Sequence, residues 1–372
     1  MKYTFIRSFA YFLSSVLFIL AFSSFNIAGS RKMIVLQKLA DRNVSLTFKI
    51  DFNISSGPEL IKDKFAVYQT PLSSISRLTA NMDKLSEANV KHLRYEIGWG
   101  KNEELGAPQI SGSAGNLQYN LNEFDEFING LKRNGVTPLY AMTYNPKPLQ
   151  DNSAVYNQWQ STPNNLIVWQ KICRDYASYF KKMGTKPLYE IWNEPDLNNI
   201  FFTGTFDEYI DIYKNAVAGI RAVEPYAVVG GPALSGANLN WYKNFLKGIG
   251  TTPISFLSGH IYNSNYPLLI KTMREALKES GRTGLPIYLT EYCAFDNLDF
   301  SQINTTGIAS KSPGASRFFR DVRNLLTYID VEKVYFAQWI DPEIRKCPSC
   351  AWLPFPDKMG MIDLNNQRKA LY

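Results

Sequence analysis

A regular alternation of short apolar strands with amphipathic helices limits the folds that this chain can adopt. From residue 65 onward, runs typical of buried strands are followed by segments whose apolar residues recur at helical spacing. Strands that alternate with helices pair in parallel through right-handed crossovers, and eight such units close into a (β/α)8 barrel. The sequence predicts these strands at 65–68, 92–97, 136–142, 187–192, 227–231, 256–261, 287–291 and 334–339.

Seven helices are predicted between these strands, and they leave one alternative fold to consider. An open, doubly wound sheet would need a switch point and a glycine-rich phosphate turn, and no GxGxxG or P-loop follows any strand. The sequence stops at Tyr372, where an eighth helix should begin, so that helix is expected to be missing or truncated. The predicted helices span 74–88, 122–134, 165–182, 206–223, 241–246, 268–277 and 315–328.

The N-terminus has the pattern of an export signal. Lys2 and Arg7 precede the apolar stretch 9–21, as in the charged and apolar regions of a secretory leader. If residues 22–27 also enter the bilayer, the segment approaches the roughly 20 residues of a spanning helix. Residues 1–28 are therefore expected to be a signal peptide or a membrane anchor, 29–64 a lead-in or tether, and 65–372 the barrel domain. Both interpretations of the leader predict an extracytoplasmic protein.

Charge and composition exclude some functions. The net charge is +7, but Lys and Arg are spread along the chain, which favours a solvated surface over a nucleic-acid partner. With only two histidines, no His-rich metal site is expected, and no metal or cofactor is predicted. Cys347 and Cys350 form a lone CxxC, for which a redox motif, half of a zinc site and a local disulfide are the alternatives; a disulfide that pins the loop is favoured.

Two glutamates stand at the ends of predicted strands. Glu194 follows the fourth strand and Glu291 ends the seventh. Side chains at the carboxyl ends of barrel strands converge, so this pair can face one bond from two sides. Glycoside hydrolysis needs such a pair, one carboxyl protonated and one ionised. No GxSxG elbow is present, which argues against a Ser/His/Asp hydrolase.

The surroundings of the two glutamates suggest different roles. Glu194 lies between Trp192 and Pro195, and apolar surroundings raise the pKa of a carboxyl, which suits an acid. Glu291 is expected to lie near Arg94 and Tyr262, which suits an anion. The sequence therefore predicts an acid at Glu194 and an ionised carboxylate at Glu291.

The segment EIWNEPDL, residues 190–197, resembles the acid/base segment of glycoside hydrolase family 39, which contains β-xylosidases and α-L-iduronidases. The resemblance extends from about residue 65 to the end. The family belongs to a clan of retaining (β/α)8 glycosidases. The WNEP core is shared across that clan, and VGGPALSG with SGHIY narrows the resemblance to family 39. The resemblance is carried by residues 189–236, by SGHIYNSN at 258–265, by PIYLTEY at 286–292 and by GMIDLNNQRKALY at 360–372.

This resemblance implies roles for individual residues. Glu194 would be the acid/base and Glu291 the nucleophile. The other implied roles are Asn193 on the sugar 2-hydroxyl, Arg94 paired with the nucleophile, His260 and Tyr262 lining the glycone site, and Trp339 as the platform beneath the sugar. The chain departs from the family at Glu96, where a histidine is common, and this places a third carboxylate in the predicted pocket.

The expected function is therefore that of an exported retaining glycoside hydrolase, acting by double displacement on a β-xyloside or an extracellular polysaccharide, without a cofactor. Retention predicts carboxyl groups about 5–5.5 Å apart, against about 6.5–9.5 Å for inversion. The main alternative is a non-catalytic glycan-binding barrel at the cell surface, which would use the aromatic rings but need neither glutamate. A redox function through Cys347 and Cys350 is a third.

Overall fold

The structure is a computed structural model that describes residues 63–100, 109–151, 156–293, 312–343 and 359–369. The leader predicted at 1–28 and almost all of the lead-in at 29–64 lie outside these residues, as do Cys347 and Cys350. Those predictions therefore stay predictions. None of the described helices combines the length and the apolar character needed to cross a bilayer.

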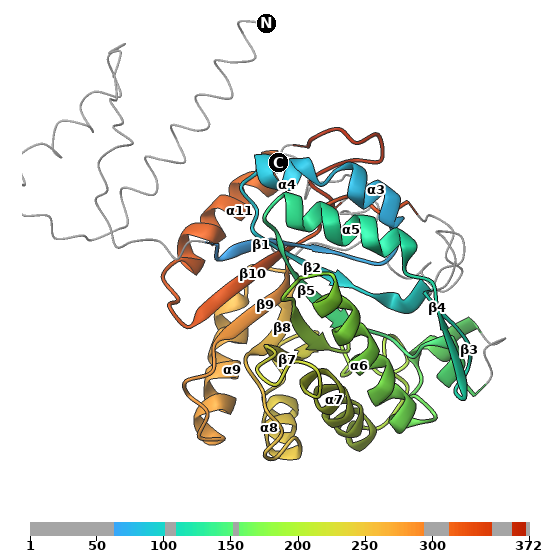
Figure 1. Cartoon of the computed structure of the whole chain (residues 1–372). Helices are drawn as coiled ribbons and strands as arrows, with labels where there is room; N and C mark the ends of the chain where they lie inside the picture. The colour runs from blue at the N-terminus through green and yellow to red at the C-terminus, as the bar shows by residue number, and fades with distance from the viewer. Residues whose placement is uncertain (1–62, 101–108, 152–155, 294–311, 344–358, 370–372) are drawn as a thin grey trace, which may run out of the picture. The chain divides into compact units, whose positions relative to one another are not determined.

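Eight parallel strands form a closed barrel, which confirms the predicted fold (Figure 1). Around the barrel the strands follow the order β1-β10-β9-β8-β7-β6-β5-β2. Closure is made by β1, which pairs with β10 through Phe65 and Val334 and with β2 through Val67 and Leu93. The strands are β1 Phe65–Gln69, β2 His92–Glu96, β5 Thr137–Met142, β6 Leu188–Ile191, β7 Val229–Leu234, β8 Leu257–Ile261, β9 Ile287–Tyr292 and β10 Val331–Ala337.

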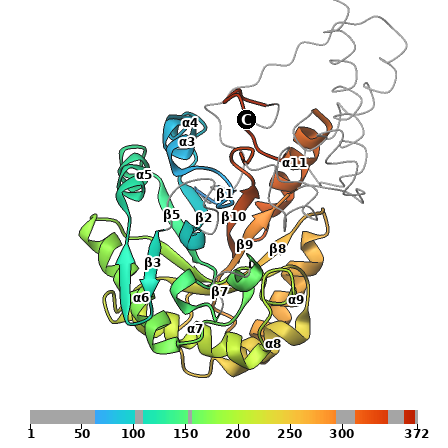
Figure 2. The same cartoon turned by 90° about the vertical axis from the view of Figure 1, so that its right-hand side faces the viewer.

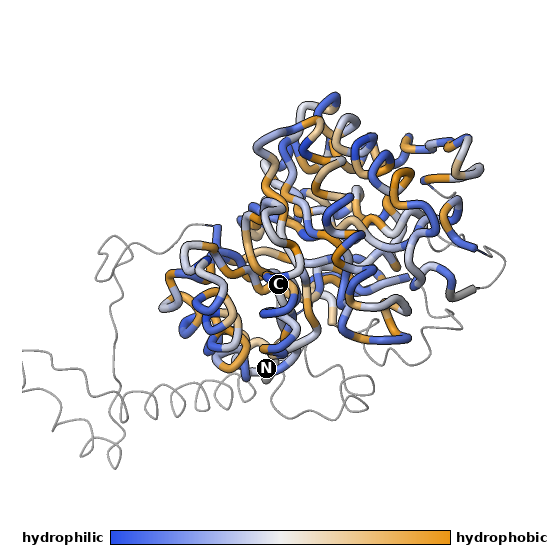
Figure 3. The backbone as a smooth tube through the Cα atoms, turned by 90° about the horizontal axis from the view of Figure 1, so that it is seen from below, coloured by the Kyte–Doolittle hydropathy of each residue, from blue (hydrophilic) through white to orange (hydrophobic). Residues whose placement is uncertain are grey.

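Helices surround the barrel (Figure 2). Each amphipathic helix packs an apolar face inward, and Figure 3 shows hydrophobic and hydrophilic residues alternating along them. In α6, the longest of the described helices, the buried face includes Trp169, Cys173 and Tyr176. The helices are α3 Ile75–Ala80, α4 Asp83–Glu87, α5 Asn122–Arg133, α6 Leu166–Lys182, α7 Phe206–Arg221, α8 Leu239–Gly248, α9 Tyr266–Glu279 and α11 Ser312–Leu325.

The structure differs from the sequence prediction at two places before α5. The helix expected at 74–88 is divided into α3 and α4 at Asn81. The side-chain amide of Asn81 donates through Nδ2 to the Arg77 carbonyl at 2.9 Å. Local bonds of this kind compete with the continuation of a helix. An antiparallel hairpin, β3 Ile110–Ser113 and β4 Asn116–Tyr119, also stands between β2 and α5 and was not predicted.

The predicted truncation of the eighth helix concerns the chain after β10. The residues described there, 338–343 and 359–369, contain no helix. Instead, the second of these segments returns to the barrel end, where the Met361 N–H donates to the Gln338 carbonyl at 3.1 Å and the Ile362 N–H to the Trp339 carbonyl at 3.1 Å. Residues 344–358 lie outside the description.

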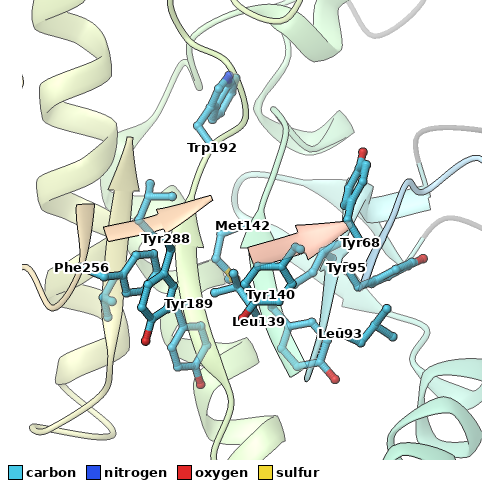
Figure 4. Packing of buried hydrophobic residues seen from close by; sticks show 14 of the residues in the cluster. Tyr68, Leu93, Tyr95, Leu139, Tyr140, Met142, Tyr189, Trp192, Phe256 and Tyr288 are labelled. Carbon is cyan, nitrogen blue, oxygen red and sulfur yellow. The ribbon is translucent and has the colours of Figure 1, made fainter. Parts of the chain in front are cut away.

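Aromatic side chains form much of the buried core (Figure 4). Tyr140 stacks on Phe180 with ring centroids 4.3 Å apart, and Phe256 stacks on Tyr288 at 4.1 Å. Trp192 belongs to the same core and lies beyond the end of β6, toward the top of Figure 4. Aromatic residues make up 14% of the chain, and many of them lie in this core, where stacked rings bury large apolar surfaces.

Candidate active site

The turn that ends β6 holds two residues in the left-handed backbone region. Trp192 has φ 71° and Glu194 has φ 45°, values that are uncommon for residues other than glycine and persist only where the surroundings fix them. The Glu194 N–H donates to the Ala233 carbonyl at 3.0 Å. Asp196 accepts from the Ser235 N–H at 3.0 Å and from its hydroxyl at 2.8 Å. These bonds attach the turn to the end of β7 and fix the position of Glu194.

Glu194 and Glu291 meet at a shared imidazole. His260, in β8, has Nδ1 2.8 Å from Glu194 Oε1 and 3.7 Å from Glu291 Oε1. One oxygen from each glutamate and a His260 ring nitrogen all lie within 4.8 Å of one another. All three residues are buried. This separation is shorter than the about 6.5–9.5 Å between the carboxyl groups of inverting glycosidases and lies close to the about 5–5.5 Å of retaining ones.

Arg94, in β2, connects the site to the barrel interior. Its guanidinium is fully buried and donates in three directions: Nη1 to Glu291 Oε1 at 2.8 Å, Nη2 to Asn193 Oδ1 at 2.7 Å and Nε to Glu190 Oε2 at 2.6 Å. A planar guanidinium presents its donors in a fixed fork, so these bonds lock the relative positions of the acceptors. The predicted pairing of Arg94 with Glu291 is present in the structure.

Tyrosine hydroxyls surround the carboxylates. The Tyr262 hydroxyl donates to Glu291 Oε2. The Tyr68 hydroxyl donates to Glu96 Oε1, and the Tyr144 hydroxyl to Glu96 Oε2 at 2.7 Å. Glu96 lies 3.8 Å from Arg94 Nη1, and its side chain is buried. The third carboxylate expected from the sequence is therefore part of the same network.

Burial shifts the protonation of the two central carboxyls. The pKa of Glu194 lies well above its ordinary value, because burial disfavours the charged form and the nearby Glu291, Asp196 and Glu96 oppose a further negative charge. Burial also raises the pKa of Glu291, to about 7, against the opposing effect of Arg94. Burial, reinforced by Arg94, keeps the pKa of His260 well below its ordinary value, so this imidazole is neutral. The arrangement favours a protonated Glu194 beside an ionisable Glu291.

Seven of the eight predicted site residues fall in this one network: Glu194, Glu291, Asn193, Arg94, Glu96, His260 and Tyr262. The eighth, Trp339, follows β10, where its backbone N–H donates to the Tyr68 carbonyl at 2.8 Å. Its side chain is buried. The individual roles predicted from the family resemblance, including the sugar platform at Trp339, stay predictions.

Three residues of the network were not among the predicted site residues. Tyr68, in β1, and Tyr144, after β5, hold Glu96, and Glu190, in β6, holds Arg94. Glu190 carries a signal that sequence analysis could have used. It lies inside a strand of a parallel barrel, where both faces are buried, and a buried charge requires a partner. Tyr68 carries no comparable signal, because a tyrosine in a strand is most often part of the core.

Glu194, His260 and Glu291 also form a potential metal-binding group by distance alone. Their chemistry does not fit a divalent cation well. The positive guanidinium of Arg94 already lies 2.8 Å from Glu291, and His260 Nδ1 is engaged with Glu194. A second cation would be repelled by the first. The arrangement suits proton transfer between paired carboxyls better than metal coordination.

Two curated β-xylosidases are similar to this chain in sequence. A β-xylosidase of Geobacillus stearothermophilus is 26% identical over 217 residues, which cover 50% of this chain and 42% of that protein. A β-xylosidase of Caldicellulosiruptor saccharolyticus is 23% identical over 318 residues, covering 77% of this chain and 61% of that protein. The chain thus spans about half the length of these curated relatives.

Solved structures show the same fold. A family 39 β-xylosidase from Caulobacter crescentus superposes with a TM-score of 0.66 at 18% identity, over 86% of this chain and 71% of that one. The family 39 enzyme from Xanthomonas axonopodis pv. citri gives a TM-score of 0.64 at 18% identity, over 83% of this chain and 64% of that one. The sequence profile of the glycosyl hydrolases family 39 matches residues 77–297. The chain therefore belongs to glycosyl hydrolase family 39, as its strand-end motifs predicted.

Proposed function

We propose that this protein is a retaining glycoside hydrolase in which Glu194 is the acid/base and Glu291 the nucleophile. The observation that carries the proposal is the spacing of the two carboxyls, whose oxygens lie within 4.8 Å across His260. The raised pKa of Glu194 supports its role as a proton donor near neutral pH, while Arg94 and Tyr262 favour the ionised form of Glu291. Family membership supports the same reaction.

In the first step, an oxygen of Glu291 attacks the anomeric carbon while Glu194 donates its proton to the leaving oxygen. The glycosidic bond breaks and a glycosyl ester of Glu291 forms. Asn193 is oriented by Arg94, which occupies its Oδ1 at 2.7 Å and leaves the Nδ2 group as a donor for a sugar hydroxyl. Such a bond would strengthen in the transition state.

In the second step, Glu194 is ionised and acts as a base. It takes a proton from water, whose oxygen attacks the anomeric carbon, and Glu291 leaves as a carboxylate. Neutral His260 contacts Glu194 at 2.8 Å and can hold this carboxyl in place in both protonation states. Because both displacements invert, the product keeps the configuration of the substrate.

The substrate we propose is a β-xyloside or a related glycoside within an extracellular polysaccharide. Support comes from the two curated relatives, which are β-xylosidases. The leader predicted at 1–28 would carry the enzyme out of the cytoplasm to such a polymer, and this part rests on the sequence alone.

The test is a screen of aryl glycosides and polysaccharides with the wild type and with Glu194→Gln and Glu291→Gln. We expect hydrolysis by the wild type and a loss of at least about a hundredfold in kcat for each variant, the scale set by removal of a positioned proton donor or nucleophile. Glycan binding that persists in all three proteins without turnover in any would instead support the alternative, a non-catalytic glycan-binding barrel.

A further inference from the structure

Glu190 is a buried carboxylate that the proposed reaction does not use. It lies in the middle of β6, four residues before Glu194, and is fully buried. Its Oε2 accepts from Arg94 Nε at 2.6 Å, while its Oε1 has no hydrogen-bond partner among the residues that the structure describes. Within that part of the chain, the charge of Glu190 therefore depends on one ion pair. A buried carboxylate of this kind is costly unless its partner stays in place.

We propose that Glu190 is a positioning residue that orients Arg94 and shares its positive charge with Glu291. Arg94 donates through Nε to Glu190 and through Nη1 to Glu291, so one guanidinium serves two carboxylates. The two donors stand at different positions of a rigid planar group. The bond from Nε to Glu190 in β6 therefore also fixes the direction in which Nη1 points toward Glu291 in β9. The inference rests on the proposed function, since it concerns the nucleophile of that reaction.

Sharing the charge of Arg94 between the two carboxylates affects the pKa of Glu291 in one direction. A negative charge at Glu190 competes with Glu291 for the field of Arg94 and makes ionisation of Glu291 harder. Glu190 is indeed among the groups that raise the pKa of Glu291, after burial and with Glu96, against the effect of Arg94. Glu190 would thus keep the pKa of Glu291 higher than Arg94 alone would set it.

Several other titratable or charged groups face Glu291 and also influence its pKa. They come from every strand that contributes to the site, namely Tyr68 in β1, Arg94 and Glu96 in β2, Tyr144 after β5, Glu190 and Glu194 on β6 and its turn, and His260 and Tyr262 at the end of β8. Of these, Glu190 is distinctive because it accepts from Arg94 Nε, while Glu291 accepts from Nη1 of the same guanidinium.

The variant that isolates the charge is Glu190→Gln. The amide oxygen can still accept from Arg94 Nε, so the geometry is retained while the negative charge is removed. We expect the acidic limb of the pH profile of kcat/KM to move to lower pH by about one unit, because Arg94 then serves Glu291 alone. A purely structural role would leave the limb in place. The matched control is Glu224→Gln, which removes a carboxylate that contacts Tyr189 of β6 at 3.4 Å outside the site.

A second readout does not depend on turnover. Carbon-13 NMR of glutamate-labelled protein, with the Glu291 carboxyl assigned through Glu291→Gln, gives the pKa of Glu291 directly in the wild type and in Glu190→Gln. A fall of about one unit in Glu190→Gln and none in Glu224→Gln is expected. An unchanged value in a folded Glu190→Gln protein would overturn the inference. Absence of hydrolysis by the wild type would instead count against the proposed function and leave the NMR result decisive for Glu190.

Discussion

At the scale of single residues, the site depends on how one buried guanidinium is shared. Arg94 touches Glu190, Asn193 and Glu291 and lies 3.8 Å from Glu96. Burial would ordinarily lower the pKa of an arginine, but the carboxylates around it outweigh that effect and raise the pKa of Arg94. The carboxylates and the arginine therefore support one another, and removal of the arginine affects all of them.

This predicts a large loss of stability for Arg94→Met. Methionine fills similar space but leaves Glu190 buried without its ion-pair partner, which should lower the free energy of unfolding by about 3–5 kcal/mol. Urea unfolding followed by circular dichroism measures it. The matched control is Arg274→Met, whose partner Asp330 is on the surface and where the loss should stay below about 1 kcal/mol. Equal losses in the two variants would contradict the account of Arg94.

The two central glutamates and the imidazole between them were predictable from the sequence, but some of the residues that hold the network together were not. Glu194, Glu291 and His260 were predictable because the barrel brings the carboxyl ends of its strands together. Glu190 and Tyr68 were missed because their contacts depend on which side chains meet across the barrel. That is set by strand register, such as Tyr68 opposite Arg94 between β1 and β2, and local pattern does not contain it.

At the scale of elements, the helix pair α6 and α7 supports the strand that carries the acid. The Tyr209 hydroxyl of α7 donates to the Ile191 carbonyl at the end of β6 at 3.0 Å, and the Trp169 indole of α6 donates to the Ile212 carbonyl of α7 at 3.0 Å. The two helices approach closely at Gly219, where an added Cβ would lie 2.3 Å from the Gln170 carbonyl oxygen. The glycine is needed for this close approach.

Gly219→Ala should therefore separate α6 from α7 and lower the free energy of unfolding by about 1–3 kcal/mol, as overpacking does. The matched control is Gly130→Ala in α5, where the new Cβ would meet Met82 Cγ at an ordinary 3.4 Å. That variant should gain about 0.5–1 kcal/mol from alanine's better helix propensity. Urea unfolding of both variants measures the difference, and a stabilised Gly219→Ala protein would show that the helices do not pack as described.

Element boundaries show where local pattern was sufficient. Most of the helices were predicted because each has a buried face at helical spacing, and the strands because burial on both faces makes each a short apolar run. The hairpin β3–β4 was missed because it is short and lies outside that alternation; in β4, for example, Tyr119 is 36% exposed. The division of α3 from α4 was missed because it depends on the side-chain bonds of Asn81, which apolar spacing does not reveal.

At the scale of the whole molecule, the barrel brings residues from distant parts of the sequence to one place. Arg94 and Glu291 are separated by 197 positions yet make a 2.8 Å bond. The fold was predictable because eight alternating units have few ways to close. The protonation of the two glutamates was predictable only in part, since it depends on the burial of the assembled site. The proposed assignment of acid and nucleophile follows from a difference between the two residues. Glu291 accepts from Arg94 and Tyr262, which favours its ionised form, whereas burial and nearby carboxylates keep the pKa of Glu194 well above its ordinary value.

The most direct test of this assignment is the configuration of the sugar first released from an aryl glycoside, observed by proton NMR before mutarotation. Because an oxygen of Glu194 and one of Glu291 lie within 4.8 Å, we expect two displacements at the anomeric carbon, so the first product has the same anomeric configuration as the substrate. First release of the opposite anomer would mean a single displacement by water and would contradict the roles of Glu194 and Glu291 proposed above.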